Sequence, residues 1–179
     1  MRTIHIETIL PTSAERVWFA MQSPATFLYV CRGLFGVPAL AGRAEPMRPG
    51  ERGTAWLFAF HLVPAYRHTI EIAEVDETSR TIRSHEHGGV LRAWNHTLHV
   101  EPTDENHCRY TDTVDIDAGP ATAFVAAIAV GIYRYRQRRV AQTRSAASAA
   151  AGSGLRKLAC SPNSVCRCRR PSTARSLLN

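Results

Sequence analysis

The sequence predicts an α+β protein in which a curved, seven-stranded antiparallel sheet wraps around a long C-terminal helix. Three observations support this fold class. Apolar and polar residues alternate over residues 2–10, which indicates a half-buried strand. Six further strand-like segments lie between residues 37 and 117 and are joined by short turns, a pattern typical of consecutive hairpins. After Gly119-Pro120 the apolar residues recur at helical spacing.

Two short helices are expected directly after the first strand. Val17, Trp18 and Met21 share one helical face, and Ser23-Pro24 separates this helix from a second one over about residues 24–30. The six later strands are expected at residues 37–44, where the pattern is weak, and at 54–62, 68–76, 81–86, 93–101 and 108–117. A last helix is expected over about residues 121–143, with Phe124 and Ile128 on its apolar stripe.

The chain is expected to divide into a folded ligand-binding domain, residues 1–144, and a low-complexity basic tail, residues 145–179. The tail holds six of the 22 basic residues and none of the 15 acidic ones, so the net charge of +7 arises almost entirely there. It has no hydrophobic period and is expected to be disordered. Residues 1–144 carry 16 basic residues against 15 acidic ones, a balance that predicts no nucleic-acid partner.

Other functional classes lack their sequence signals. The N-terminus shows no signal-peptide pattern and the longest apolar run, Ala121 to Tyr133, is too short to span a bilayer, so a cytoplasmic location is expected. No phosphate-binding, dinucleotide or Gly-x-Ser-x-Gly motif occurs, and no cofactor is expected. His85 and His87 are predicted to face outward, and no metal site is expected. A monomer and a homodimer both remain open.

The cysteines also separate into two groups. Cys31 and Cys108 lie in the folded part, and the other three lie in the tail. Five is an odd number and no spacing repeats, so the pattern is not that of a disulfide framework. Cys31 and Cys108 are expected to be small buried residues.

Even-numbered strand residues are predicted to face the interior, because in each strand they are the more apolar set. Registering the hairpins by their loop centres places a polar row across this face. His68 is expected opposite Glu86, Glu86 opposite Trp94 or His96, and His96 opposite Asp112 or one diagonal away. Unpaired buried carboxylates are costly, so Glu86 and Asp112 should be paired or lie near a solvated pocket.

The inner face predicts a pocket for a small apolar ligand. Its expected lining residues are Trp56, Phe58, Phe60, His68, Glu86, Trp94, His96, Leu98, Tyr110, Asp112, Phe124 and Ile128. The polar row can be a structural network, or it can orient the polar end of a ligand. Acid–base catalysis by His96 and Asp112 is a third interpretation, which also requires a substrate.

Four motifs resemble those of the START/polyketide cyclase-like superfamily (SRPBCC), whose members have the helix-grip fold. The motifs lie in residues 4–18, 86–97, 109–114 and 133–139. The resemblance covers about residues 1–143. It implies a cavity for lipids, polyketides, hormones or other apolar molecules between sheet and helix. Some members are cyclases, dehydratases or hydroxylase domains, and many only bind a ligand.

Three functional hypotheses follow. The first is a carrier or sensor-type module that binds a small hydrophobic ligand such as a lipid or polyketide. The second is a cyclase/dehydratase-like enzyme in which His96, held by Asp112, acts as the general base. The third is a non-catalytic interaction protein, for instance a co-chaperone, which predicts a small cavity and an exposed apolar patch.

Overall fold

One antiparallel sheet of seven strands makes up most of the computed structural model, which describes residues 1–156 and the side chains of residues 1–142. The strands are β1 (Arg2–Leu10), β2 (Phe35–Gly36), β3 (Arg52–Ala59), β4 (Val63–Asp76), β5 (Thr81–Gly88), β6 (Leu91–Pro102) and β7 (Cys108–Asp117). Their order across the sheet is β1-β7-β6-β5-β4-β3-β2, so β2 to β7 are consecutive neighbours and β1 lies beside β7. The predicted fold class is confirmed.

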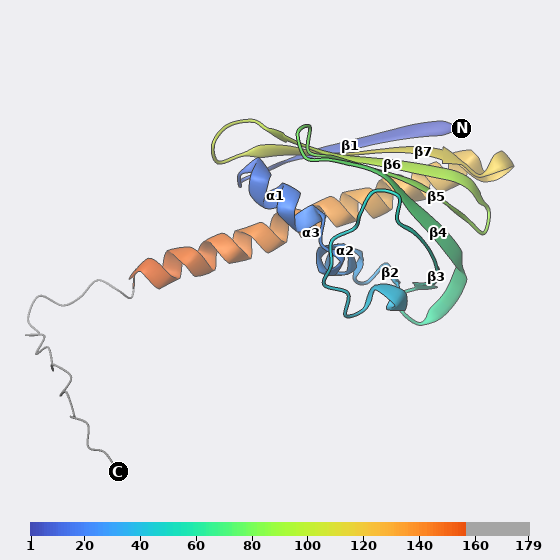
Figure 1. Cartoon of the computed structure of the whole chain (residues 1–179), viewed down its shortest axis with the longest axis horizontal. Coiled ribbons are helices and arrows are strands. Elements are labelled where there is room, and N and C mark those ends of the chain that lie inside the picture. The colour runs from blue at the N-terminus through green and yellow to red at the C-terminus, as the bar shows by residue number, and fades with distance from the viewer. Residues whose placement is uncertain (157–179) are drawn as a thin grey trace, which may run out of the picture.

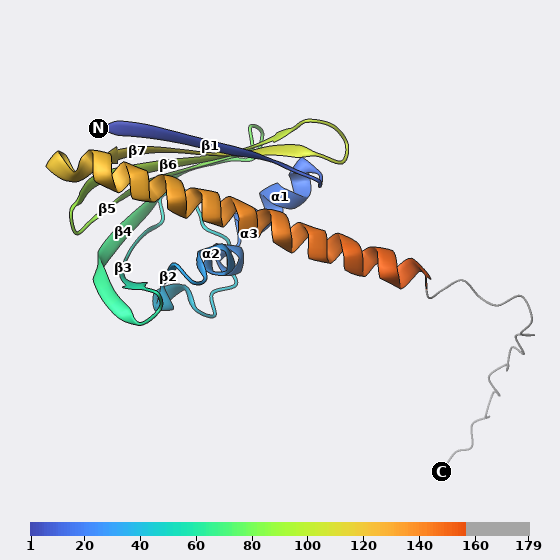
Figure 2. The ribbon, with the colours of Figure 1, turned by 180° about the vertical axis from the view of Figure 1, so that it is seen from behind.

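The sheet curls around the last helix. The helical elements are α1 (Ala14–Met21), α2 (Pro24–Cys31), α3 (Thr122–Arg156) and two 3₁₀ turns, η1 (Pro38–Leu40) and η2 (Gly119–Ala121). Helix α3 crosses the concave side of the sheet, and α1 and α2 lie toward one end of that side (Figures 1 and 2). Within residues 1–156, no helix has both the length and the hydropathy needed to cross a bilayer.

Helix α3 continues beyond the end that was expected near residue 143. The rest of the predicted tail, residues 157–179, lies outside the described residues. The prediction of a weak strand at residues 37–44 is wrong. Strand β2 pairs with β3 only through Phe35 and Gly36, and Pro38 then begins η1. Proline has a fixed φ and no N–H to donate, which suits the first position of a helical turn.

Even-numbered residues face the interior in β1, β5, β6 and β7, as predicted. The buried members of this set are Ile4, Leu10, Ser84, Leu98, Val100, Cys108, Tyr110, Asp112, Val114 and Ile116. Glu86 pairs with Trp94, one of the two expected registers. His96 pairs with Val114, so Asp112 lies one diagonal away. The expected direct pairing of His68 with Glu86 is wrong, because Glu86 pairs with Ile70 and His68 lies on the diagonal.

The inward orientation predicted for Trp56, Phe58 and Phe60 is wrong. Ala55 pairs with His68, and paired residues share a face, so the odd-numbered residues of β3 point inward. Trp56 is 49% exposed and Phe60 is 69% exposed. A register shift between Leu57 and Phe58 adds an irregularity beside the turn, and a one-residue shift in pairing reverses the faces.

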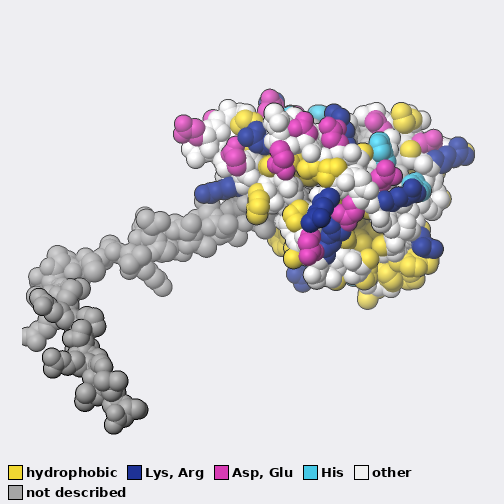
Figure 3. Space-filling view, viewed as in Figure 1, with side chains coloured by type: hydrophobic (Ala, Val, Ile, Leu, Met, Phe, Trp, Pro, Cys, Tyr) yellow, Lys and Arg dark blue, Asp and Glu magenta, His cyan; other side chains and the backbone are white. Residues whose placement is uncertain are grey.

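The β3–β4 turn is formed by residues that are not typical of turns. Phe60 and His61 both adopt positive φ angles, 52° and 64°, a conformation that glycine and asparagine favour. The composition of residues 58–63 therefore does not mark a turn. Phe60, Leu62 and Val63 are exposed, and hydrophobic side chains gather at this end of the sheet in the lower right of Figure 3.

The face of α3 that meets the sheet also differs from the prediction. Phe124 and Ile128 are exposed, so their predicted inward orientation is wrong. The buried positions are instead Ala126, Ala129, Tyr133, Arg136, Gln137 and Val140. The small alanines allow the helix to pack close to the sheet. In this orientation of the helix, Phe124 and Ile128 face the solvent.

Two clusters of buried side chains hold the layers together. The first joins α1, α2 and the later part of α3 to β6 and β7, and the second joins the first part of α3 to β1 and β7. Cys31 and Cys108 belong to the first cluster and are buried, as expected. No buried member of either cluster belongs to β3, β4 or β5.

Candidate ligand pocket

A pocket of about 500 Å³ lies between α2, α3 and the concave face of strands β3 to β6. None of its lining residues belongs to β1 or β7. Its larger apolar lining residues are Met21, Phe27, Val30, Leu34, Phe35, Val37, Leu40, Met47, Leu57, Ile70, Ile72, Ile82, Leu91, Leu98 and Ile132. The volume lies within the range of about 300–1,000 Å³ that is common for small-molecule sites.

The first polar group in the pocket wall is the pair of His68 and Glu86. His68 Nε2 lies 2.8 Å from Glu86 Oε2, and the Ser84 hydroxyl donates to Glu86 Oε1 at 2.6 Å. Burial by itself raises the pKa of Glu86, but hydrogen bonds from His68 and Ser84, together with the charge of nearby His96, lower it below its ordinary value. Glu86 is therefore an ionised acceptor at neutral pH.

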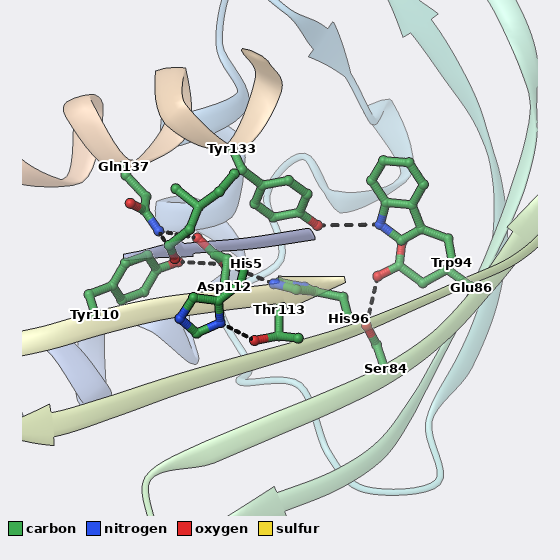
Figure 4. Close-up of polar contacts among 11 residues, drawn as sticks. His5, Ser84, Glu86, Trp94, His96, Tyr110, Asp112, Thr113, Tyr133 and Gln137 are labelled. Carbon is green, nitrogen blue, oxygen red and sulfur yellow. Dashed lines mark hydrogen bonds and ion pairs between the residues drawn. The ribbon is translucent and has the colours of Figure 1, made fainter. Parts of the chain in front are cut away.

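The second polar group is the pair of His96 and Asp112. His96 lies in the pocket wall, whereas Asp112 lies behind it, with no exposed side-chain surface. His96 Nε2 is 2.8 Å from Asp112 Oδ1, Tyr110 donates its hydroxyl to the same oxygen at 3.3 Å, and Gln137 Nε2 donates to Oδ2 at 2.9 Å (Figure 4). Burial by itself raises the pKa of Asp112, but these bonds and nearby positive charge lower it.

The ionised state of Asp112 determines the tautomer assigned to His96. A carboxylate only accepts hydrogen bonds, so Nε2 of His96 carries the proton that is donated to Asp112. In neutral His96 the lone pair is then on Nδ1. The imidazole could accept a proton there, with Asp112 stabilising the resulting cation.

Three side chains from β6 and α3 complete this part of the wall. Trp94 Nε1 donates to the Tyr133 hydroxyl at 3.3 Å, and the two rings stack with centroids 6.2 Å apart (Figure 4). Burial raises the pKa of Tyr133, which keeps its hydroxyl neutral. The guanidinium of Arg136 lies over the Tyr133 ring, with its central carbon 4.8 Å from the centroid.

The structure brings five of the expected site residues together in the pocket wall: His68, Glu86, Trp94, His96 and Leu98. Tyr110 and Asp112 are buried behind that wall. The other five expected lining residues, Trp56, Phe58, Phe60, Phe124 and Ile128, lie outside it.

Several lining residues were missed. Tyr66 precedes His68 by two positions on β4, and burial raises its pKa to about 12. Phe27 belongs to α2, and Tyr133 and Arg136 belong to α3. Tyr66 shares the even parity of the polar row, so strand alternation could have identified it. Arg136 gave no such signal, because it is one of four arginines within residues 134–139 of α3.

The sheet and the helix that it grips form the helix-grip fold of START-like (SRPBCC) proteins. A START superfamily protein from Mycobacterium smegmatis superposes with a TM-score of 0.58 and 9% identity, covering 79% of this chain and 95% of that chain. Norcoclaurine synthase from Thalictrum flavum, in complex with dopamine and hydroxybenzaldehyde, gives a TM-score of 0.58 and 14% identity, with 79% and 85% coverage.

A third similar structure is the di-domain ARO/CYC protein BexL from the BE-7585A biosynthetic pathway. It has a TM-score of 0.60 and 16% identity, and the match covers 79% of this chain and 46% of BexL. At these identities the similarity shows the fold alone. The family described as "Domain of unknown function (DUF8410)" matches residues 34–143, more than half of the chain, and the chain belongs to this family. A comparison with curated proteins finds no match.

Proposed function

We propose that this protein binds a small, largely apolar molecule in the pocket under β3 to β6, as a carrier or sensor-type module. The observation that carries the proposal is a pocket of about 500 Å³ with an apolar lining and a few polar groups on one wall. Such a combination is typical of sites that bury a ligand and fix its orientation. The binding domain in this proposal is residues 1–144, and the proposed location of the protein is the cytoplasm.

A neutral fluorescent probe tests this proposal. N-phenyl-1-naphthylamine should bind the purified full chain saturably, with increased fluorescence. Ala55 lines the pocket, whereas Trp56 points away from it, so Ala55→Trp should fill the space and weaken probe binding about tenfold or more. Trp56→Ala is the matched control and should leave the affinity within about twofold.

Two results would contradict the proposal. One is the absence of saturable binding to the wild-type protein. The other is an Ala55→Trp variant that retains wild-type affinity and a wild-type circular dichroism spectrum. If the probe binds as expected, native mass spectrometry of the purified protein would identify the molecule bound in the cell.

A cyclase/dehydratase-like reaction is a second candidate. It is favoured by the placement of His96 in the pocket wall with the buried carboxylate of Asp112 behind it. If His96 is a general base, His96→Ala should abolish turnover of an identified ligand while its affinity changes little. Parallel loss of binding and turnover would leave the base role unsupported. The co-chaperone hypothesis predicted a small cavity and an exposed apolar patch. A pocket of about 500 Å³ does not fit the first expectation, whereas exposed Phe60, Leu62 and Val63 fit the second.

A further inference from the structure

Arg136 is a pocket-lining residue whose guanidinium forms no ion pair with a side chain of residues 1–142, although the charge of Asp112 acts on it from a greater distance. Arg136 is 8% exposed and lies in the pocket wall. Among the described side chains, no carboxylate lies within 4 Å of its guanidinium, and no hydrogen bond from it is found. Its Nε–H is fully buried without a partner. Burying a guanidinium without hydrogen-bond acceptors costs free energy, unless another group supplies an acceptor for its N–H donors.

The immediate surroundings of Arg136 are aromatic. Its central carbon lies 5.6 Å from the Phe27 ring centroid and 4.8 Å from the Tyr133 centroid. Cation–π contacts stabilise the positive charge but provide no hydrogen-bond acceptor in the guanidinium plane. The guanidinium of Arg136 is therefore held in place, and its two Nη groups make no hydrogen bond within residues 1–142 and can donate to a ligand.

The carboxylates of Glu86 in the pocket wall and of Asp112 behind it already accept hydrogen bonds from other side chains. Glu86 accepts from His68 and Ser84, and Asp112 accepts from His96, Tyr110 and Gln137. Arg43, another pocket-lining arginine, differs from Arg136, because it forms an ion pair with Glu51 that includes a 2.7 Å hydrogen bond. Of these two arginines, Arg136 is the one left for an anion from outside the chain.

We infer that the ligand of this pocket is amphipathic, with a carboxylate that Arg136 binds and an apolar body that lies against the surrounding side chains. A planar carboxylate can accept two parallel hydrogen bonds from one guanidinium. One arginine balances one negative charge, which favours a carboxylate over a phosphate dianion. The inference rests on the proposed function, since it specifies the ligand class of the same pocket.

Two ligands of equal chain length test the inference. Dodecanoate and dodecanol are used to displace N-phenyl-1-naphthylamine from the full chain at neutral pH. The wild-type protein should bind dodecanoate about tenfold or more tightly than dodecanol, because charge-assisted hydrogen bonds to a buried arginine are absent for the alcohol. Arg136→Met should weaken dodecanoate binding by the same factor and leave dodecanol affinity within about threefold.

Arg138→Met is the matched control, because it removes the same charge from an exposed position on the same helix. It should retain the preference for dodecanoate. Equal affinity of the wild-type protein for the two ligands would overturn the inference, and so would a preference that persists in Arg136→Met. If Arg136→Met fails to fold, the ratio of dodecanoate to dodecanol affinity in the wild-type protein still tests the inference. Failure of the probe and of both ligands to bind would instead reject the proposed function itself.

Discussion

The inner face of the sheet carries two histidine–carboxylate pairs, His68–Glu86 and His96–Asp112, with the same 2.8 Å between Nε2 and a carboxylate oxygen. Their surroundings differ. The side chain of Asp112 has no exposed surface, whereas that of Glu86 retains 12%. The groups that bond to Asp112 come from β6, β7 and α3, whereas those that bond to Glu86 come from β4 and β5 alone.

This difference in burial and in bonding partners indicates that the two histidine–carboxylate pairs have different roles, although their distances are the same. Gln137 bonds both Asp112 and the backbone carbonyl of Ile6, so the Asp112 network joins α3 to β7 and β1. Glu86 joins only neighbouring strands and lies in the pocket wall. We infer that the His96–Asp112 pair mainly holds helix and sheet together, and that the His68–Glu86 pair mainly presents polar atoms to a ligand.

The largest expected effect is on stability. Asp112→Ala should lower the free energy of unfolding by about 3–5 kcal/mol, because it leaves His96, Tyr110 and Gln137 buried without their shared acceptor. Glu86→Ala should cost about 1–2 kcal/mol, since water in the pocket can replace the lost carboxylate. Urea unfolding monitored by circular dichroism measures both values. Equal losses would remove the distinction between the two pairs.

The next effect concerns ligand recognition. The carboxylate of Glu86 can accept a hydrogen bond from a hydroxyl group, so the protein should prefer 2-naphthol to 2-methoxynaphthalene. Glu86→Gln should reduce this preference roughly fivefold, because it removes the charge from the acceptor. Asp112→Asn should leave the ratio unchanged, since Asp112 lies behind the wall. Probe displacement measures the four affinities, and a larger change in Asp112→Asn than in Glu86→Gln would reverse the assignment of roles.

The His96–Asp112 pair was predictable from sequence because its determinants are local. Strand alternation placed both residues on the inner face, and the short β6–β7 loop limited the register to a direct or diagonal pairing. The same reasoning failed for β3, because its turn uses left-handed Phe60 and His61 in place of glycine or asparagine. Trp56 and Phe60 were placed in the pocket because they are large apolar residues, but both are exposed.

Arg136 could not be predicted because its environment depends on how α3 is rotated against the sheet. The apolar stripe of Phe124 and Ile128 suggested one rotation, and the alanines at 126 and 129 produce another. The run of arginines at positions 134, 136, 138 and 139 looks uniformly solvated in sequence. Tertiary packing selects one of them for burial, and no pattern in the run identifies which.

Acid should weaken both pairs. The folded-state pKa values of Asp112 and Glu86 are lowered, so in the acid range the unfolded chain binds more protons than the folded one. The stability from each pair is therefore complete above about pH 5 and is lost as the pH falls through the lowered pKa. Urea unfolding between pH 7 and pH 3 should show this decline.

The variants Asp112→Asn and Glu86→Gln separate the two contributions to that decline. Each removes one titrating carboxylate, so each curve of stability against pH should be flatter than that of the wild-type protein. Wild-type stability that is constant or rises toward pH 3 would contradict the lowered pKa values. If the slope of stability against pH were unchanged in both variants, the loss of stability in acid would have to arise from other carboxylates.

The smallest effect is expected for an ion pair on the outer face of the sheet. Arg83 and Glu74 approach to 2.7 Å, as closely as the buried pairs, but their side chains are 57% and 44% exposed. Water screens such a pair, so Glu74→Gln should change the free energy of unfolding by less than about 1 kcal/mol. Urea unfolding alongside Asp112→Ala provides the measurement. A loss as large as that of Asp112→Ala would mean that distance, and not burial with shared partners, determines what a charged pair contributes in this protein.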